Sequence, residues 1–223
     1  MGVIESATLT LLGLIIGFTF AMAIARYDLR KTYEEAEANA IGTEYLRAEL
    51  LDPKSNAKVK SLLSDYLTLR IDYYREHDKK QVNQLNMQTI QIQTQLWNEV
   101  ASQARSTPNP ITALAAAGMN DVLNSQGYTQ AAWWNRIPLA AWTLMMAIAI
   151  CSNMLVGFGA RNFMKNIGLF MIFPLVVSTS FFLIADIDSP RGGIIRVEPH
   201  NLMELQKSLH FSLNTEPPMQ YNK

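Results

Sequence analysis

The chain has 223 residues, 49% of them hydrophobic, and its 19 basic and 19 acidic residues give a formal net charge of zero. This balance lacks the basic footprint of a nucleic-acid-binding protein, so we expect no nucleic-acid partner. The apolar residues gather in three long runs and most charged residues lie elsewhere, which is typical of a protein that crosses a membrane several times.

The first apolar run predicts a transmembrane helix over residues 7–25. Residues 6–25 contain no charge and no proline, and about twenty such residues in a helix cross a hydrocarbon core of about 30 Å. No basic residue precedes the run, whereas Arg26, Arg30 and Lys31 follow it. We therefore expect a retained span and not a cleaved signal peptide, with the N-terminus outside and Lys31 in the cytoplasm.

The same helix is expected to continue into the cytoplasm to about residue 50, because no strong helix breaker occurs before residues 52–53, Asp-Pro. Its polar half carries Glu34, Glu35 and Glu37. Two interpretations of this acidic run remain open. It is either a solvated helix face or the lining of a cation vestibule.

Two stripes with four-residue spacing run along the predicted first span. Small residues form one stripe, which lets helix backbones approach closely in lipid. The neighbouring stripe is bulkier, and in a ring of helices it would face a central pore. Ordinary helix packing is the alternative explanation of both stripes. The small stripe is Gly13, Gly17, Ala21 and Ala25, and the neighbouring stripe is Thr10, Leu14, Phe18 and Met22.

A cytoplasmic helical domain is predicted over residues 26–136. Its second long helix is expected to begin at a cap formed by Ser55 or Asn56 and to run through about residue 104, with a local bend at residues 77–78. Apolar residues in the second half of this helix, from Val82 to Leu96, have coiled-coil spacing, which fits a hairpin within the chain as well as a seam between subunits.

A third cytoplasmic helix is expected at about residues 111–125. Asn109 is a suitable helix cap, and Pro110 is suited to the first helical position.

Two further apolar runs predict membrane spans at residues 137–160 and 167–185, with Arg161 and Lys165 in the short loop between them. Three spans from an outside N-terminus place the tail, residues 186–223, in the cytoplasm. We therefore expect a multi-pass protein of the inner (plasma) membrane, with the lipid bilayer as one partner and most of the polar domain inside the cell.

The third span is followed by the motif DIDSPRGG, which places Asp186 and Asp188 at the end of a membrane helix. Carboxylates there are costly against lipid and should face protein, water or a cation such as Arg191 or Arg26. A salt-bridged structural knot is one interpretation. An ion site at the cytoplasmic mouth is the other.

Catalytic and metal-binding motifs are absent from the sequence. The three histidines lie far apart and have no HExxH or CxxC motif beside them. There is also no Walker loop, no dinucleotide fingerprint and no nucleophile elbow. We therefore expect no enzyme activity, no cofactor and no metal centre.

Several stretches resemble one membrane protein family. Gly17-Phe18 followed after seven residues by Arg26-Tyr27 resembles the pore helix of bestrophins. The run from residue 11 to 51, including EEAEANAIGTEYLRAELL, together with residues 135–138 and the segment IADIDSPRGGIIRVEPHNLMELQ, resembles the bacterial family labelled bestrophin-like. This second resemblance spans nearly the whole chain.

The resemblance implies a channel whose narrow neck would fall on Thr10, Leu14 and Phe18. Two positions depart from the bestrophin pattern: Thr10 is polar where bestrophins have bulky apolar residues, and Asp28 stands where they usually have tryptophan. The resemblance therefore implies no particular ion selectivity.

We therefore predict an all-helical membrane protein with three spans and a cytoplasmic domain of long helices. The chain would assemble as a symmetric homo-oligomer, a pentamer by resemblance, and conduct inorganic ions through an apolar neck at Leu14 and Phe18. A non-conducting membrane scaffold or sensor, whose cytoplasmic helices bind a partner, is the main alternative. A divalent-metal transporter that uses Asp186, Asp188 and the acidic run of the first helix is a third hypothesis.

Overall fold

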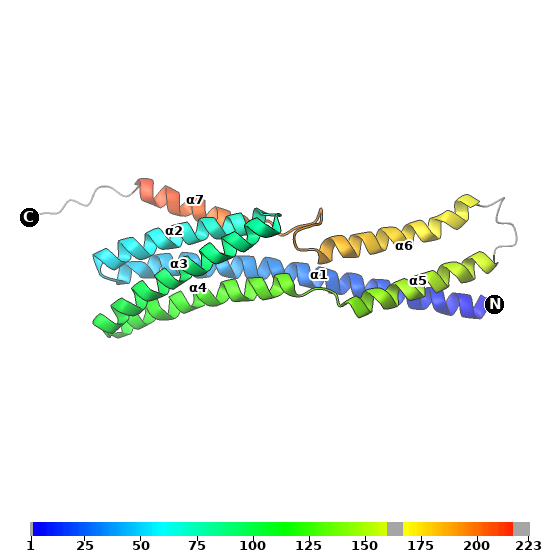
Figure 1. Ribbon diagram of the computed structural model, residues 1–223, viewed down its shortest axis with the longest axis horizontal. Coiled ribbons are helices and arrows are strands. Elements are labelled where there is room, and N and C mark those ends of the chain that lie inside the picture. Colours follow the sequence, from blue (N-terminus) through cyan, green and yellow to red (C-terminus); the bar gives the residue numbers. More distant parts are fainter. Residues whose placement is uncertain (1, 160–166, 216–223) are drawn as a thin grey trace, which may run out of the picture. The chain divides into compact units, whose positions relative to one another are not determined.

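The described part of the chain is helical. A computed structural model describes residues 2–159 and 167–215, and these residues contain no strand. The all-helical fold class predicted from the sequence is confirmed for them. Arg161, Lys165 and the end of the tail lie outside the described residues. The elements in order (Figure 1) are α1 (Gly2–Arg47), the short 3-10 helix η1 (Ala48–Leu50), α2 (Pro53–Arg75), α3 (Lys79–Ser106), α4 (Pro110–Trp134), α5 (Leu139–Gly159), α6 (Ile167–Asp188) and α7 (His200–Thr215).

Three helical stretches of the described chain are long and apolar enough to cross a membrane. They lie within Gly2–Leu50, Pro110–Phe158 and Phe170–Asp188. Each of these stretches overlaps one of the spans expected from the sequence, and the bounds of the spans stay predictions. These stretches support the membrane-protein class.

The chain divides into two compact units, and α1 contributes to both. The first unit contains residues 1–29 and 133–196, and the second contains residues 30–132 and 197–223. The first unit therefore holds the apolar stretches, and the second holds the polar helices.

The first unit is held together by apolar contacts of α1 with α5 and α6. Leu12 packs with Ala149 and Val177 in one buried cluster. Ala23 and Ile184 belong to a second cluster. One face of α1 therefore packs within its own chain, and the opposite face is free to contact lipid or another copy of the chain.

The second unit is built around a hairpin of α2 and α3, which pack along each other. Leu63 and Tyr66 of α2 and Leu96 and Val100 of α3 are fully buried. At the turn, the Glu76 side chain accepts hydrogen bonds from two backbone N–H groups of residues 77–78. The coiled-coil spacing of α3 is therefore used for packing within the chain.

Helices α4 and α7 complete the second unit. Tyr128 of α4 stacks on Tyr33 of α1, with ring centroids 5.9 Å apart. Leu205 of α7 packs over Gly42 of α1, so closely that a Cβ at Gly42 would lie 2.9 Å from the leucine methyl. These contacts hold both helices against the second half of α1.

Three helix boundaries differ from those expected from the sequence. The cap of α2 is Asp52, whose carboxylate accepts hydrogen bonds from the backbone N–H groups of Lys54 and Ser55, and not Ser55 or Asn56. The expected bend at residues 77–78 is a complete break between two helices. Helix α4 does begin after the Asn109 cap, but it extends nine residues beyond the predicted end, to Trp134.

Candidate functional site

The bulky stripe of α1 is exposed in the single chain. The exposed fractions are 51% for Leu14, 65% for Phe18 and 44% for Met22. Thr10 is also exposed, and its hydroxyl donates to the Ser6 carbonyl of its own helix at 2.8 Å. Three large apolar side chains therefore lie in a row without cover from their own chain, and the hydroxyl at the end of the row is hydrogen-bonded within the helix.

The small stripe beside it is also uncovered. A Cβ added at Gly13 or Gly17 would meet nothing within 4 Å among the described residues. Ala21 and Ala25 are exposed. Since the buried face of α1 is elsewhere, around Leu12 and the other residues of the first unit's core, the stripe is not explained by packing within the described chain.

Asp188 joins three elements of the first unit at the end of α6. Its Oδ1 lies 3.3 Å from Nη1 of Arg26 on α1. The backbone N–H of Ile137, just before α5, donates to both carboxylate oxygens, at 3.2 and 3.1 Å. Of the two cations proposed from the sequence, the structure places Arg26 at this carboxylate. This arrangement favours the salt-bridged knot over an ion site at the cytoplasmic mouth.

Asp186 holds the loop that follows α6. Its two oxygens accept hydrogen bonds from the backbone N–H groups of Ile194 and Ile195, at 2.7 and 2.8 Å. The loop passes so close that a Cβ at Gly193 would lie 2.9 Å from Cγ of Asp186. Arg191 lies over the ring of Trp133, 4.3 Å from its centroid. Both carboxylates of the motif thus bind backbone amides, which leaves them poor candidates for a metal site.

The acidic run of α1 is divided between burial and exposure. Glu34 is 2% exposed and accepts hydrogen bonds from the side chain of Asn201 and the backbone N–H of Leu202, at 2.6 and 3.0 Å. It therefore caps the first turn of α7, where a negative charge is favoured. Glu35 is exposed. The solvated face, one of the two interpretations of this run, fits the exposed Glu35 but not the buried Glu34.

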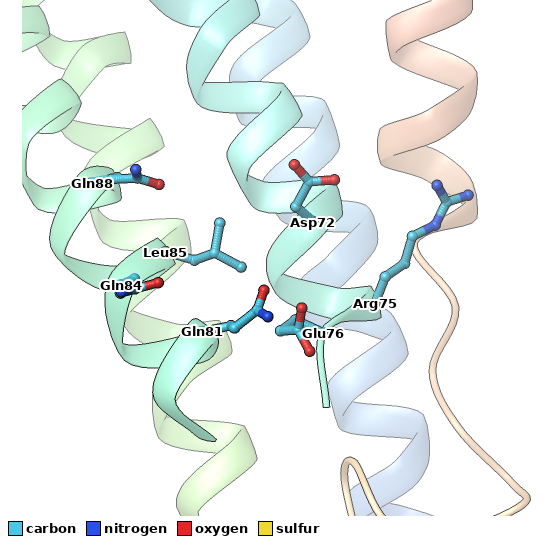
Figure 2. A pocket seen from close by; sticks show the side chains of 7 residues that line it. All are labelled: Asp72, Arg75, Glu76, Gln81, Gln84, Leu85 and Gln88. Carbon is cyan, nitrogen blue, oxygen red and sulfur yellow. The ribbon is translucent and has the colours of Figure 1, made fainter. Parts of the chain in front are cut away.

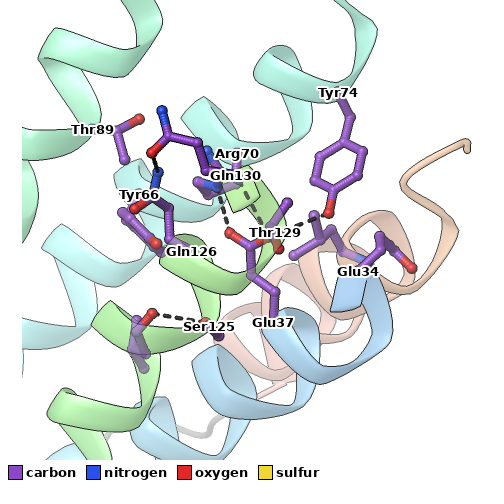
Figure 3. Close-up of polar contacts among 12 residues, drawn as sticks. Glu34, Glu37, Tyr66, Arg70, Tyr74, Thr89, Ser125, Gln126, Thr129 and Gln130 are labelled. Carbon is purple, nitrogen blue, oxygen red and sulfur yellow. Dashed lines mark hydrogen bonds and ion pairs between the residues drawn. The ribbon is translucent and has the colours of Figure 1, made fainter. Parts of the chain in front are cut away.

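Glu37 is the centre of a buried polar network in the second unit (Figure 3). Its carboxylate pairs with Arg70, and neither side chain is exposed to solvent. The hydroxyls of Thr129 and Tyr74 donate to the same carboxylate at 3.0 and 3.4 Å. The network thus connects α1, α2 and α4.

Burial affects the titration of this network. Burial alone acts to lower the pKa of Arg70, but the Glu37 carboxylate together with Tyr66 and Tyr74 outweighs it, so the net shift is upward. Burial raises the pKa of Tyr74, and the Glu37 charge raises it further. Arg70 therefore stays charged and Tyr74 stays neutral across the physiological range. Arg70 and Thr129 could not be predicted from the sequence, because no local pattern marks a contact between helices so far apart in the chain.

A polar cleft of about 370 Å³ lies where α2 turns into α3 (Figure 2). It contains none of the residues predicted as functional from the sequence, and its charged groups lie on the last turn of α2 and on Glu76, which directly follows this helix. Within residues 2–159 and 167–215, no group of three or more potential ligands could hold a metal ion. The cleft is lined by Asp72, Arg75, Glu76, Gln81, Gln84, Leu85 and Gln88.

Comparisons with known proteins agree with the fold. A family model described as the Bestrophin-like domain matches residues 2–202. A comparison with curated proteins found no match.

Solved structures provide a second comparison. The crystal structure of a bacterial bestrophin homologue from Klebsiella pneumoniae has a TM-score of 0.75 at 13% identity, covering 97% of this chain and 89% of that one. A single-substitution variant of that homologue has a TM-score of 0.72 at 13% identity, covering 95% and 87%. At this identity the likeness shows a shared fold.

Proposed function

The chain belongs to the Bestrophin-like family, and from this membership we propose that it is a passive ion channel formed by several copies arranged around α1. Its fold is that of bestrophin homologues, and bestrophins are ion channels. Five copies are proposed by analogy with bestrophins. The proposed spans are residues 7–25, 137–160 and 167–185 in the inner (plasma) membrane, with the polar helices in the cytoplasm.

The exposed row of Leu14, Phe18 and Met22 is the observation that carries this proposal. In a ring of α1 helices, Leu14 and Phe18 would form an apolar neck, with Thr10 and Met22 at its ends. Apolar constrictions gate by dewetting: water leaves a narrow apolar pore and ions cannot pass without their hydration shells.

The small stripe supports assembly of the ring. Gly13 and Gly17 leave space beside the neck residues that no described part of the chain fills. A neighbouring helix that packs there would bury backbone against backbone, which is how helices associate in lipid. The apolar core within the first unit is filled by side chains, so a conducting path requires more than one copy.

Paired substitutions in the neck test the proposal. Replacing Leu14→Ala and Phe18→Ala together widens the neck, so ion flux into proteoliposomes should rise several-fold. A matched control replaces Leu144→Ala and Phe182→Ala, which lie on α5 and α6 with similar exposure, 55% and 62%. Unchanged flux in the neck variant, at equal protein incorporation, would reject this neck.

A membrane scaffold that binds a cytosolic protein is the second candidate. It is favoured by exposed Met87, Ile90 and Trp97, which lie on a stretch of α3 without charged residues. If the assembled particle has no opening along its symmetry axis and no variant conducts ions into proteoliposomes, the chain is a scaffold and not a channel.

A further inference from the structure

Glu44 is a buried acid on the second half of α1, outside the proposed span. It lies nineteen residues beyond Ala25, or about 28 Å along a helix. Its side chain is 0% exposed. Among the residues that the structure describes, neither carboxylate oxygen has a hydrogen-bond partner. This is unlike Glu34 and Glu37 of the same helix, both of which accept several hydrogen bonds.

The carboxyl group of Glu44 lies against the backbone of α4. At Gly118, a Cβ would overlap Oε2 of Glu44 and Nη1 of Arg47. Only glycine leaves room for these two side chains between the helices. With α4 in place, water has no access to the acid.

Two charged groups act on Glu44, one on each of the helices in contact. Arg47 lies one turn further along α1, and Asp121 lies one turn beyond Gly118 on α4. Burial raises the pKa of Glu44 to about 8, Arg47 opposes this rise and Asp121 adds to it. The group is therefore mostly a neutral acid at neutral pH.

We propose that Glu44 is a proton-binding site that couples the packing of α4 on α1 to pH. With its proton, the neutral acid fits between the helices at moderate cost. When the O–H bond breaks and the proton leaves to solvent, an anion without hydrogen bonds remains at Gly118, and burial of such a charge is strongly unfavourable. The anion is hydrated when α4 moves away from α1, so loss of the proton opens this contact.

The proposal does not depend on ion conduction and is tested without it. Infrared difference spectra of the full chain in detergent, between about pH 6.5 and about pH 9.5, should show loss of a protonated-carboxyl band. This band should be missing from the Glu44→Gln variant and present in Glu35→Gln, the exposed control on the same helix. A band that persists in Glu44→Gln would overturn the assignment.

Hydrogen exchange of α4 tests the conformational half of the proposal. After correction for the intrinsic pH dependence of exchange, amides near Gly118 should exchange at least several-fold faster at the higher pH in the wild type. They should not do so in Glu44→Gln. Equal acceleration in both proteins would contradict the coupling.

Asp121→Asn provides an independent variant if Glu44→Gln does not fold. It removes an exposed charge that favours protonation of Glu44, so the midpoint of the infrared and exchange transitions should move to lower pH. An unchanged midpoint would count against the site.

Discussion

Asp188 binds the backbone N–H of Ile137 through both of its carboxylate oxygens. The carboxylate thereby fixes the end of α6 to the start of α5, and Arg26 adds a link to α1. The three apolar helices of the first unit are thus joined at one buried charge.

Asp188→Ala should destabilise the protein by about 3 kcal/mol, because it leaves a partly buried Arg26 and a buried N–H group without their acceptor. Chemical or thermal unfolding in detergent measures the change. Asp188→Asn keeps an acceptor for the N–H group and should therefore lose less stability than Asp188→Ala. An alanine variant as stable as the wild type would show that the carboxylate does not hold these helices together.

Removing one partner of the Glu37 and Arg70 pair should cost about 3–5 kcal/mol, since the other charge stays buried alone. Replacing both, as Glu37→Leu with Arg70→Met, should cost less than the sum of the single changes. A double-mutant cycle of unfolding free energies measures the difference. Strict additivity would mean that the pair is not coupled.

Gly17→Leu should reduce assembly without unfolding the chain. The added side chain meets nothing within the described residues but would block a neighbouring helix. Mass measurement of the purified particle gives the subunit number. The control is Gly157→Leu on α5, where the site is equally open and lies off the stripe. If both variants keep the wild-type mass, the stripe is not the subunit contact.

The stability of the wild type relative to Glu44→Gln should fall as pH rises. The pKa of Glu44 in the folded protein, about 8, exceeds the ordinary value of 4.5 for an unburied glutamate. Stability from the bound proton is therefore fully present below about pH 4.5 and is lost progressively up to about pH 8, at no more than about 1.4 kcal/mol per pH unit. Unfolding free energies measured across this range give the slope. If the unfolding free energies of the wild type and Glu44→Gln change in parallel with pH, the pKa of Glu44 is not shifted.

Local sequence signals account for much of the helical pattern. The long α1 follows from the absence of a breaker before Asp52, and the start of α4 follows from the Asn109 cap. The cap of α2 was misassigned because Asp, Ser and Asn near Pro53 are all good caps, and only the geometry distinguishes them. The complete break before α3 depends on how the Glu76 side chain folds back onto the turn.

The candidate site was only partly predictable. The two stripes of α1 are periodic and can be read directly from the sequence, as can the need for a cation near Asp188. In contrast, the partners of Glu34 and Glu37 lie on other helices, and Glu44 is buried against Gly118 of α4. A buried glutamate and a solvated one look alike in a helical sequence, because tertiary packing decides between them.

The contact of Glu34 with the start of α7 has a consequence for biosynthesis. Residues that lie 168 positions apart must meet before this carboxylate has its partners. A ribosome has made all three apolar stretches by the time Leu202 emerges. The second unit therefore cannot complete its packing until α7 has been synthesised. A chain terminated before α7 would leave this unit incomplete and prone to aggregation.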